Sequence, residues 1–272
     1  MQLGLGSYTY RWSIGIADRR PDRPMDAFTL LDRARDLGLG VVQYADNMPL
    51  DQLDERAQYR LFDAAQEAGI ALELGTQSFD AAQVDDYLKI AERLEARILR
   101  VALDEADAHI SVPDLAEQLR PRIERARDKG IKIAIENHFN YPSPRMVELL
   151  ETVDDPHLGV CLDVANSICA GEWPQETIAL LAPYTINLHL KDYEITPDPY
   201  GVGFRIHGVP LGTGRAPIPW ILDQLVHCPP DMSVLLEHWL MPEGDDIAGA
   251  IAREQPWIET SVANARKYLG KV

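Results

Sequence analysis

Four apolar runs in the second half of the chain each close on a side chain that can ionise. The four residues are Glu136 in "IKIAIENH", Asp163 in "LGVCLDVAN", His189 in "TINLHLKD" and Glu237 in "SVLLEHW". Short apolar runs of this kind are typical of buried parallel strands, and α/β barrels build their active sites where such strands end. We therefore expect the four side chains to meet at one end of a sheet.

Two glutamates, one aspartate and one histidine make a hard, oxygen-rich ligand set that suits Mn²⁺, Mg²⁺, Co²⁺ or Zn²⁺. A single carboxylate at a strand end is more often a helix N-cap or a surface charge, and a single histidine is more often a hydrogen-bonded structural group. Four together are harder to explain in that way, because three buried negative charges without a cation are costly. The sequence therefore predicts one divalent metal ion held by all four.

The rest of the chain must position these residues, and it alternates short apolar runs with longer amphipathic segments. We expect eight strands, at residues 3–7, 41–44, 71–75, 98–102, 132–137, 158–163, 185–190 and 233–237. Helices are expected over 25–38, 54–69 and 112–130, each ending on a glycine that suits a C-cap, and a last helix over 246–269.

Eight strand–helix units without a break in composition favour one closed (β/α)8 TIM barrel, a single domain over residues 1–272. The competing fold is an open doubly wound sheet, which would carry a glycine-rich phosphate turn after the first strand. The segment "GLGSYTYRWSIG" has two glycines but then aromatic residues, so that fingerprint is missing. The longest stretch expected to be irregular is 193–217, and long loops in compact domains are usually functional.

The composition of the chain excludes two classes of partner, nucleic acids and membranes. The formal net charge of −17 would repel a nucleic acid backbone, and no basic run offsets it. The three cysteines and the lack of a secretory signal argue against a disulfide framework. No segment reaches the roughly 18 apolar residues that a membrane helix needs. We expect a cytoplasmic protein that binds neither nucleic acid nor membrane.

The motifs "AIENH", "CLDVAN", "NLHLKD" and "LLEHW" together resemble the xylose-isomerase-like barrel superfamily of sugar isomerases, epimerases and related lyases, over nearly the whole chain. The resemblance implies that the four residues named above ligate one metal and that the substrate is a small keto sugar or keto sugar acid. It also implies self-association, as a homo-oligomer. The endonuclease branch of this superfamily uses more metals and many more histidines than the seven present, so that branch is rejected.

The mechanism that the resemblance implies is consistent with the chemistry of these groups. A metal chelated by a substrate carbonyl and its neighbouring hydroxyl would stabilise an enediolate. Glu136 and Glu237, on opposite sides of the metal, would remove and return a proton, which predicts an isomerase or epimerase. A lyase is the alternative, either a dehydratase or a decarboxylase of a branched 3-oxo sugar acid. A non-catalytic sugar-binding barrel is the alternative from another class.

One departure from the family pattern leaves the lyase as an alternative function. Many epimerases carry a histidine three residues after the metal-binding aspartate, but this chain has Asn166, which cannot act as an acid near neutral pH. Lys191 would either meet a substrate carboxylate or enolate oxygen, as a catalytic residue, or pair with a neighbouring acid. Arg100 interrupts "ILRVAL" and would bind a carboxylate of the substrate or pair with an acid. The other expected substrate-binding residues are Tyr8, His138, Asn166, Arg205 and His207.

Overall fold

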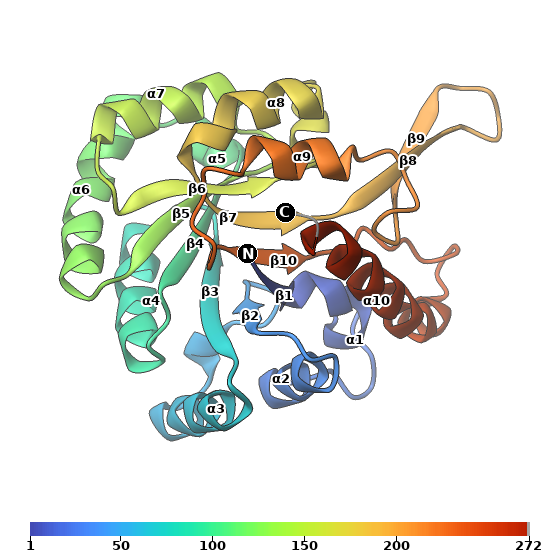
Figure 1. Cartoon of the computed structure of the whole chain (residues 1–272), viewed down its shortest axis with the longest axis horizontal. Helices are drawn as coiled ribbons and strands as arrows, with labels where there is room; N and C mark the ends of the chain where they lie inside the picture. The colour runs from blue at the N-terminus through green and yellow to red at the C-terminus, as the bar shows by residue number, and fades with distance from the viewer. Residues whose placement is uncertain (271–272) are drawn as a thin grey trace.

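The computed structural model describes residues 1–270 and contains a closed barrel of eight parallel strands, ordered β1-β10-β7-β6-β5-β4-β3-β2 (Figure 1). This is a (β/α)8 TIM barrel, as expected. The barrel strands are β1 (Gln2–Gly6), β2 (Val41–Tyr44), β3 (Ala71–Gln77), β4 (Ile98–Leu103), β5 (Lys132–Asn137), β6 (Leu158–Asp163), β7 (Thr185–Leu190) and β10 (Ser233–Leu236).

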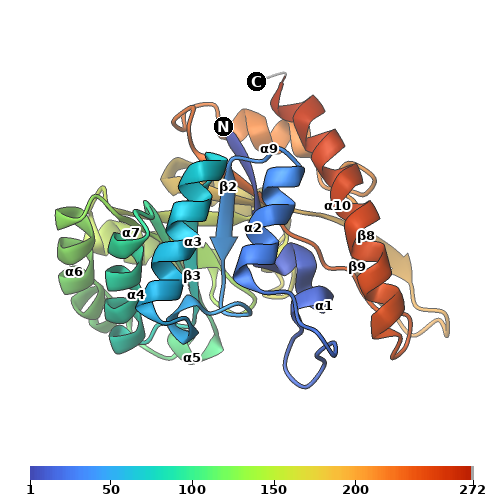
Figure 2. The ribbon, with the colours of Figure 1, turned by 90° about the horizontal axis from the view of Figure 1, so that it is seen from below.

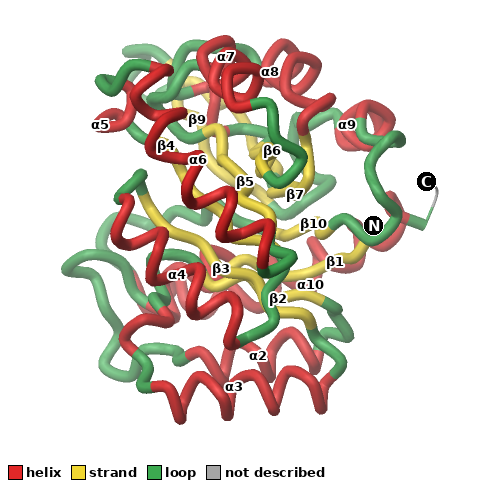
Figure 3. Tube along the Cα trace, turned by 90° about the vertical axis from the view of Figure 1, so that its left-hand side faces the viewer, coloured by secondary structure: helices red, strands yellow, loops and turns green. Residues whose placement is uncertain are grey.

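Helices surround the barrel on the outside, with the strands at the centre (Figure 3). They are α1 (Arg11–Ile14), α2 (Ala27–Asp36), α3 (Glu55–Ala68), α4 (Ala81–Arg93), α5 (Glu105–Ala108), α6 (Val112–Asp128), α7 (Ser143–Val153), α8 (Pro174–Leu181), α9 (Ile218–Gln224) and α10 (Ile247–Leu269). Within residues 1–270 no helix has the length and apolar character needed to cross a bilayer.

The ends of the expected helices are set by local chemistry. Asp26 and Asp54 each accept a hydrogen bond from the backbone N–H three residues later, at the start of α2 and α3. Gly38, Gly69 and Gly130, which follow α2, α3 and α6, have φ of 63°, 67° and 67°. That left-handed conformation ends a helix at little cost only for glycine, so the chain turns back toward the barrel at these points.

The prediction that residues 193–217 are irregular is wrong for residues 193–197 and 204–209, which form strands. An antiparallel hairpin forms there, from β8 (Asp192–Pro197) and β9 (Phe204–Val209), and it extends beyond the barrel at the upper right of Figure 1. Pairing runs from Asp192 opposite Val209 to Pro197 opposite Phe204, so the backbone groups satisfy one another without a barrel neighbour. The glycines and prolines of this segment lie mostly at the tip and after β9, where they do not break the pairing.

Asp192 organises the loop that follows the hairpin. Its buried carboxylate accepts hydrogen bonds from the backbone N–H groups of Tyr193, Gly212, Gly214 and Ala216, at 2.8–2.9 Å. The return segment is thereby folded back against the start of β8. In Figure 2 the hairpin lies on the same side of the barrel as α10.

Candidate metal centre and active site

The ionisable residues predicted from the strand ends converge. Glu136 belongs to β5, Asp163 is the last residue of β6, and His189 lies in β7, where it is paired in register with Asp163. Glu237 directly follows β10, the next strand around the barrel. All four side chains are buried, with at most 5% of any residue exposed.

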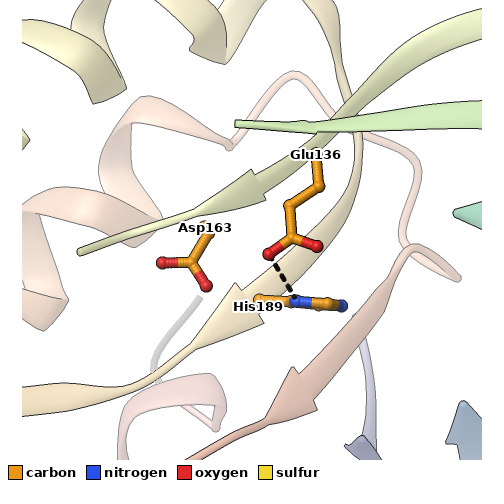
Figure 4. Close-up of side chains that lie close together, drawn as sticks. All are labelled: Glu136, Asp163 and His189. Carbon is orange, nitrogen blue, oxygen red and sulfur yellow. Dashed lines mark ion pairs between the residues drawn. The ribbon is translucent and has the colours of Figure 1, made fainter. Parts of the chain in front are cut away.

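Glu136, Asp163 and His189 each place one ligand atom within 4.8 Å of those of the other two (Figure 4). His189 Nδ1 lies 3.6 Å from Glu136 Oε1 and 3.4 Å from Glu237 Oε1. The fourth predicted ligand is therefore next to the same imidazole nitrogen. The four side chains come from four different strands of the barrel or their ends, yet their polar atoms face one small volume.

The donor atoms fit a divalent metal ion. His189 Nδ1 and Glu237 Oε1 are buried, and within the described chain neither takes part in a hydrogen bond. Buried polar atoms without hydrogen bonds are rare and costly. A shared cation would satisfy both, and carboxylate oxygens with one imidazole are ligands that such ions accept.

Lys191 lies directly at this site. Its Nζ is 2.6 Å from Asp163 Oδ2 and 3.0 Å from Glu237 Oε2, and the residue is 3% exposed. It also lies 5.0 Å from the centre of the Trp239 ring. The interpretation of Lys191 as a partner of a neighbouring acid therefore describes this structure, and the same position places its ammonium group among the side chains predicted to bind a metal.

Arg100 and Asn166 hold the two oxygens of Glu136. Arg100 Nε binds Oε2, and Asn166 Nδ2 donates to Oε1 at 2.9 Å. Arg100 is 2% exposed and also donates to the Thr76 carbonyl at 3.0 Å, while its Nη1 lies 3.5 Å from Asp46. Glu136 is therefore fixed by a cation and an amide.

These contacts determine the charges. Burial alone would raise the pKa of Glu136, but Arg100 and His189 outweigh it and hold that pKa well below its usual range. His189 and Lys191 likewise outweigh burial and lower the pKa of Glu237. Burial raises the pKa of Asp163, and Lys191 opposes the rise. Both glutamates therefore remain ionised near neutral pH, as metal ligands require.

The remaining predicted residues lie toward the mouth at different depths. Tyr8 donates to Asp46 at 2.8 Å, which connects it to Arg100. His138 Nδ1 lies 3.5 Å from Asp104. A cavity of about 450 Å³ opens beside Trp239 and is lined by His207.

Arg205 is placed differently. It pairs with Asp198 of the hairpin at 2.7 Å, its side chain is 60% exposed, and it is not among the described residues that line this cavity. Nothing in these contacts connects Arg205 to the side chains predicted to bind a metal.

The sequence profile of the xylose isomerase-like TIM barrel family matches residues 31–261. The chain belongs to this family. Within it, the chain is 28% identical over 240 residues to a 3-oxo-isoapionate decarboxylase of Pectobacterium atrosepticum, covering 88% of this chain and 86% of that protein.

Solved structures of the xylose isomerase-like fold are also similar. A D-psicose 3-epimerase from Clostridium cellulolyticum H10, crystallised with D-tagatose, superposes with a TM-score of 0.71 at 17% identity and covers 99% of both chains. A xylose isomerase-like barrel protein from Mycobacterium smegmatis, in complex with magnesium, gives 0.65 at 17% identity, covering 96% of this chain and 97% of that one. At these identities the likeness concerns the fold.

Sequence reasoning missed the polar residues inside this xylose isomerase-like barrel. Gln43, Glu73 and Asn187 point into the barrel and bond to one another, and Asp46 joins Tyr8 to Arg100. A signal was present, because Gln43, Glu73 and Asn187 interrupt the apolar runs "VVQY", "ALELG" and "TINLHL". A polar residue within a parallel strand that is buried on both faces needs a partner, and the strand pattern alone does not identify it.

Proposed function

We propose that this chain is a divalent-metal-dependent enzyme that acts on a small keto sugar acid and removes its carboxylate as CO2. The observation that carries the proposal is the pairing of both candidate bases with buried cations, Glu136 with Arg100 and Glu237 with Lys191. The 28% identity to a 3-oxo-isoapionate decarboxylase supports the same reaction class.

Epimerisation needs a carboxylate that takes a proton from carbon and a second group that returns one. A general base works best when its pKa lies near the operating pH. The pKa values of Glu136 and Glu237 are both lowered, and the residue that contacts Glu136 from the next loop is Asn166, which carries no ionisable group. The site therefore suits metal ligation better than proton abstraction from carbon.

Loss of CO2 from a 3-oxo acid places different demands on the site. The bond between the carboxylate carbon and C2 breaks, its electron pair passes toward the 3-oxo group, and C2 later receives a proton. A divalent cation held by Glu136, Asp163, His189 and Glu237 would supply the Lewis acid that accepts this electron density.

The chain itself supplies the other groups. Burial alone would lower the pKa of Lys191, but Asp163 and Glu237 outweigh it and raise that pKa. Lys191 therefore stays an ammonium group that can pair with the enolate oxygen, and water supplies the proton that C2 requires. Trp239 lies against Lys191, with the Nζ atom 5.0 Å from the centre of its ring.

The experiment compares two reactions in D2O with the metal-loaded protein. A panel of 3-oxo sugar acids is followed for CO2 release, and a panel of keto sugars is followed for deuterium uptake and for epimers. We expect CO2 release and no uptake into the keto sugars. Deuterium uptake or epimer formation without CO2 release would contradict the proposal.

Variants separate catalysis from binding. Glu237→Gln keeps the shape but removes a ligand charge, and Lys191→Met removes the buried ammonium group. We expect each to lower turnover by about 10²–10⁴-fold, whereas Glu117→Gln, on the exposed face of α6, leaves it unchanged. A non-catalytic sugar-binding barrel would release no CO2 and would keep its affinity for the acid in the Lys191→Met protein.

The second candidate is a keto sugar epimerase or isomerase. It is favoured by the positions of Glu136 and Glu237, which come from different strands and both lie near the same imidazole nitrogen. The deuterium arm of the experiment measures this activity directly.

A further inference from the structure

Beneath the metal-binding side chains, the barrel interior holds a second group of polar residues that the proposed reaction does not use. They are Gln43 of β2, Glu73 of β3, Asn187 of β7 and Ser233 of β10, each at most 6% exposed. They come from four different strands and bond to one another. Only Gln43 also touches a metal-binding residue, because its Oε1 lies 2.8 Å from His189 Nε2.

Glu73 collects the donors of this group. Its Oε2 accepts from Gln43 Nε2 and from Asn187 Nδ2, both at 3.0 Å, and its Oε1 accepts from the Ser233 hydroxyl. A carboxylate oxygen attracts donors and repels other oxygens. Gln43 must therefore turn its NH2 group toward Glu73, which leaves its Oε1 facing His189.

The reverse orientation of the Gln43 amide is unfavourable. It would place Gln43 Oε1 against the Glu73 carboxylate at about the same distance, so that two acceptors would face each other without water. It would also move the amide NH2 group away from Asn187 Oδ1, and the present 3.4 Å contact between Gln43 Nε2 and that oxygen would be lost. The hydrogen-bond partners thus select one orientation.

The orientation of Gln43 determines where the proton of His189 lies. Because Gln43 Oε1 can only accept, His189 Nε2 must carry the hydrogen of this bond. In the neutral ring that metal binding requires, the lone pair is then on Nδ1, the atom that lies 3.6 Å from Glu136 and 3.4 Å from Glu237. Nδ1 has no hydrogen-bond partner among the described residues.

We infer that Gln43, oriented by Glu73, is a positioning residue that fixes the His189 ring so that Nδ1 is the metal-binding nitrogen. The inference rests on the proposed metal site, and it adds a chain of contacts from Glu73 through Gln43 to His189. Hydrogen bonds from a metal-binding histidine to an outer partner typically change metal affinity by about 10–100-fold when they are removed.

The test uses Zn²⁺ alone as the probe, with binding measured by calorimetry and the histidine nitrogens observed by ¹⁵N NMR. The wild-type spectrum should show His189 protonated at Nε2 and zinc-bound at Nδ1. This measurement needs no variant, so it identifies the metal-binding nitrogen of His189 even if a substitution prevents folding. Zinc bound at Nε2 would overturn the inference.

One variant and a matched control measure the contribution of Gln43. Gln43→Met has a similar length but no acceptor, and we expect it to bind Zn²⁺ about 10–100-fold more weakly. The matched control is Gln58→Met, because the buried Gln58 amide donates to the Leu50 and Leu53 carbonyls on the barrel exterior.

The outcomes distinguish this inference from the proposed function. Normal zinc binding by the wild type together with unchanged affinity in Gln43→Met would overturn the inference and leave the metal site standing. Equal losses in Gln43→Met and Gln58→Met would also overturn it, because the effect would then follow from general destabilisation. A wild-type protein that binds no divalent metal would overturn the proposed function and this inference with it.

Discussion

Glu254 of α10 should make the stability of the protein fall as the pH rises toward neutrality. The residue is 1% exposed, and its carboxylate accepts from the backbone N–H of Trp12 at 2.6 Å and that of Ser13 at 3.0 Å. It thereby attaches α10 to α1, whose residues Arg11 and Trp12 line the cavity at the mouth. Burial raises the pKa of Glu254 from its ordinary 4.5 to about 7, although the bonds from Ser13 and Trp12 oppose the rise.

The sign and size of this pH effect follow from the coupling between proton binding and folding. A carboxyl whose pKa is higher in the folded protein binds its proton more tightly there, so its contribution to stability is complete below the unfolded pKa. That contribution is lost as the pH rises through the folded pKa. A rise from 4.5 to about 7 corresponds to about 3 kcal/mol of unfolding free energy lost between pH 4.5 and pH 8.

The assay is urea unfolding of the wild type and of Glu254→Gln at both pH values. Other groups titrate in both proteins, so their contributions cancel when the variant is subtracted from the wild type. The amide does not ionise, and one of its donors would face a backbone N–H, so we expect the variant to be less stable at pH 4.5. The difference should shrink by about 3 kcal/mol by pH 8. A difference that stays constant across this range would refute the reasoning.

Three further substitutions test the packing that supports the site. A methyl group at Gly6 would lie 3.0 Å from Glu237 Oε1, so Gly6→Ala should displace that carboxylate and weaken Mn²⁺ binding by about tenfold, as measured by calorimetry. A methyl group at Gly75 would lie 2.9 Å from Arg100 Cδ, and Gly75→Ala should cost about 1–3 kcal/mol in chemical denaturation; no loss would show that Arg100 moves freely. Asp192→Asn should cost about 3 kcal/mol in the same measurement, because an amide NH2 would face backbone donors, and an unchanged midpoint would contradict this account.

Much of the fold follows from local sequence patterns. Apolar runs of four to six residues marked all eight barrel strands, and β2, β5, β6 and β7 have the expected bounds. The glycines after α2, α3 and α6 marked helix ends, because the left-handed turn needed there strongly favours that residue. The hairpin at β8 and β9 was missed, since its glycines and prolines resemble those of an irregular loop.

The sequence by itself determined which residue types end the strands, and the closed parallel barrel followed from their number. Strand ends at one rim must converge, so Glu136, Asp163, His189 and Glu237 were predictable as neighbours. Only the tertiary structure decided which cation pairs with which acid and that Arg205 lies on the hairpin. Only it brought Gln43 within reach of His189, 146 residues along the chain. Such contacts depend on distances across the barrel, and these are set by the closure of all eight strands rather than by any local pattern of residues.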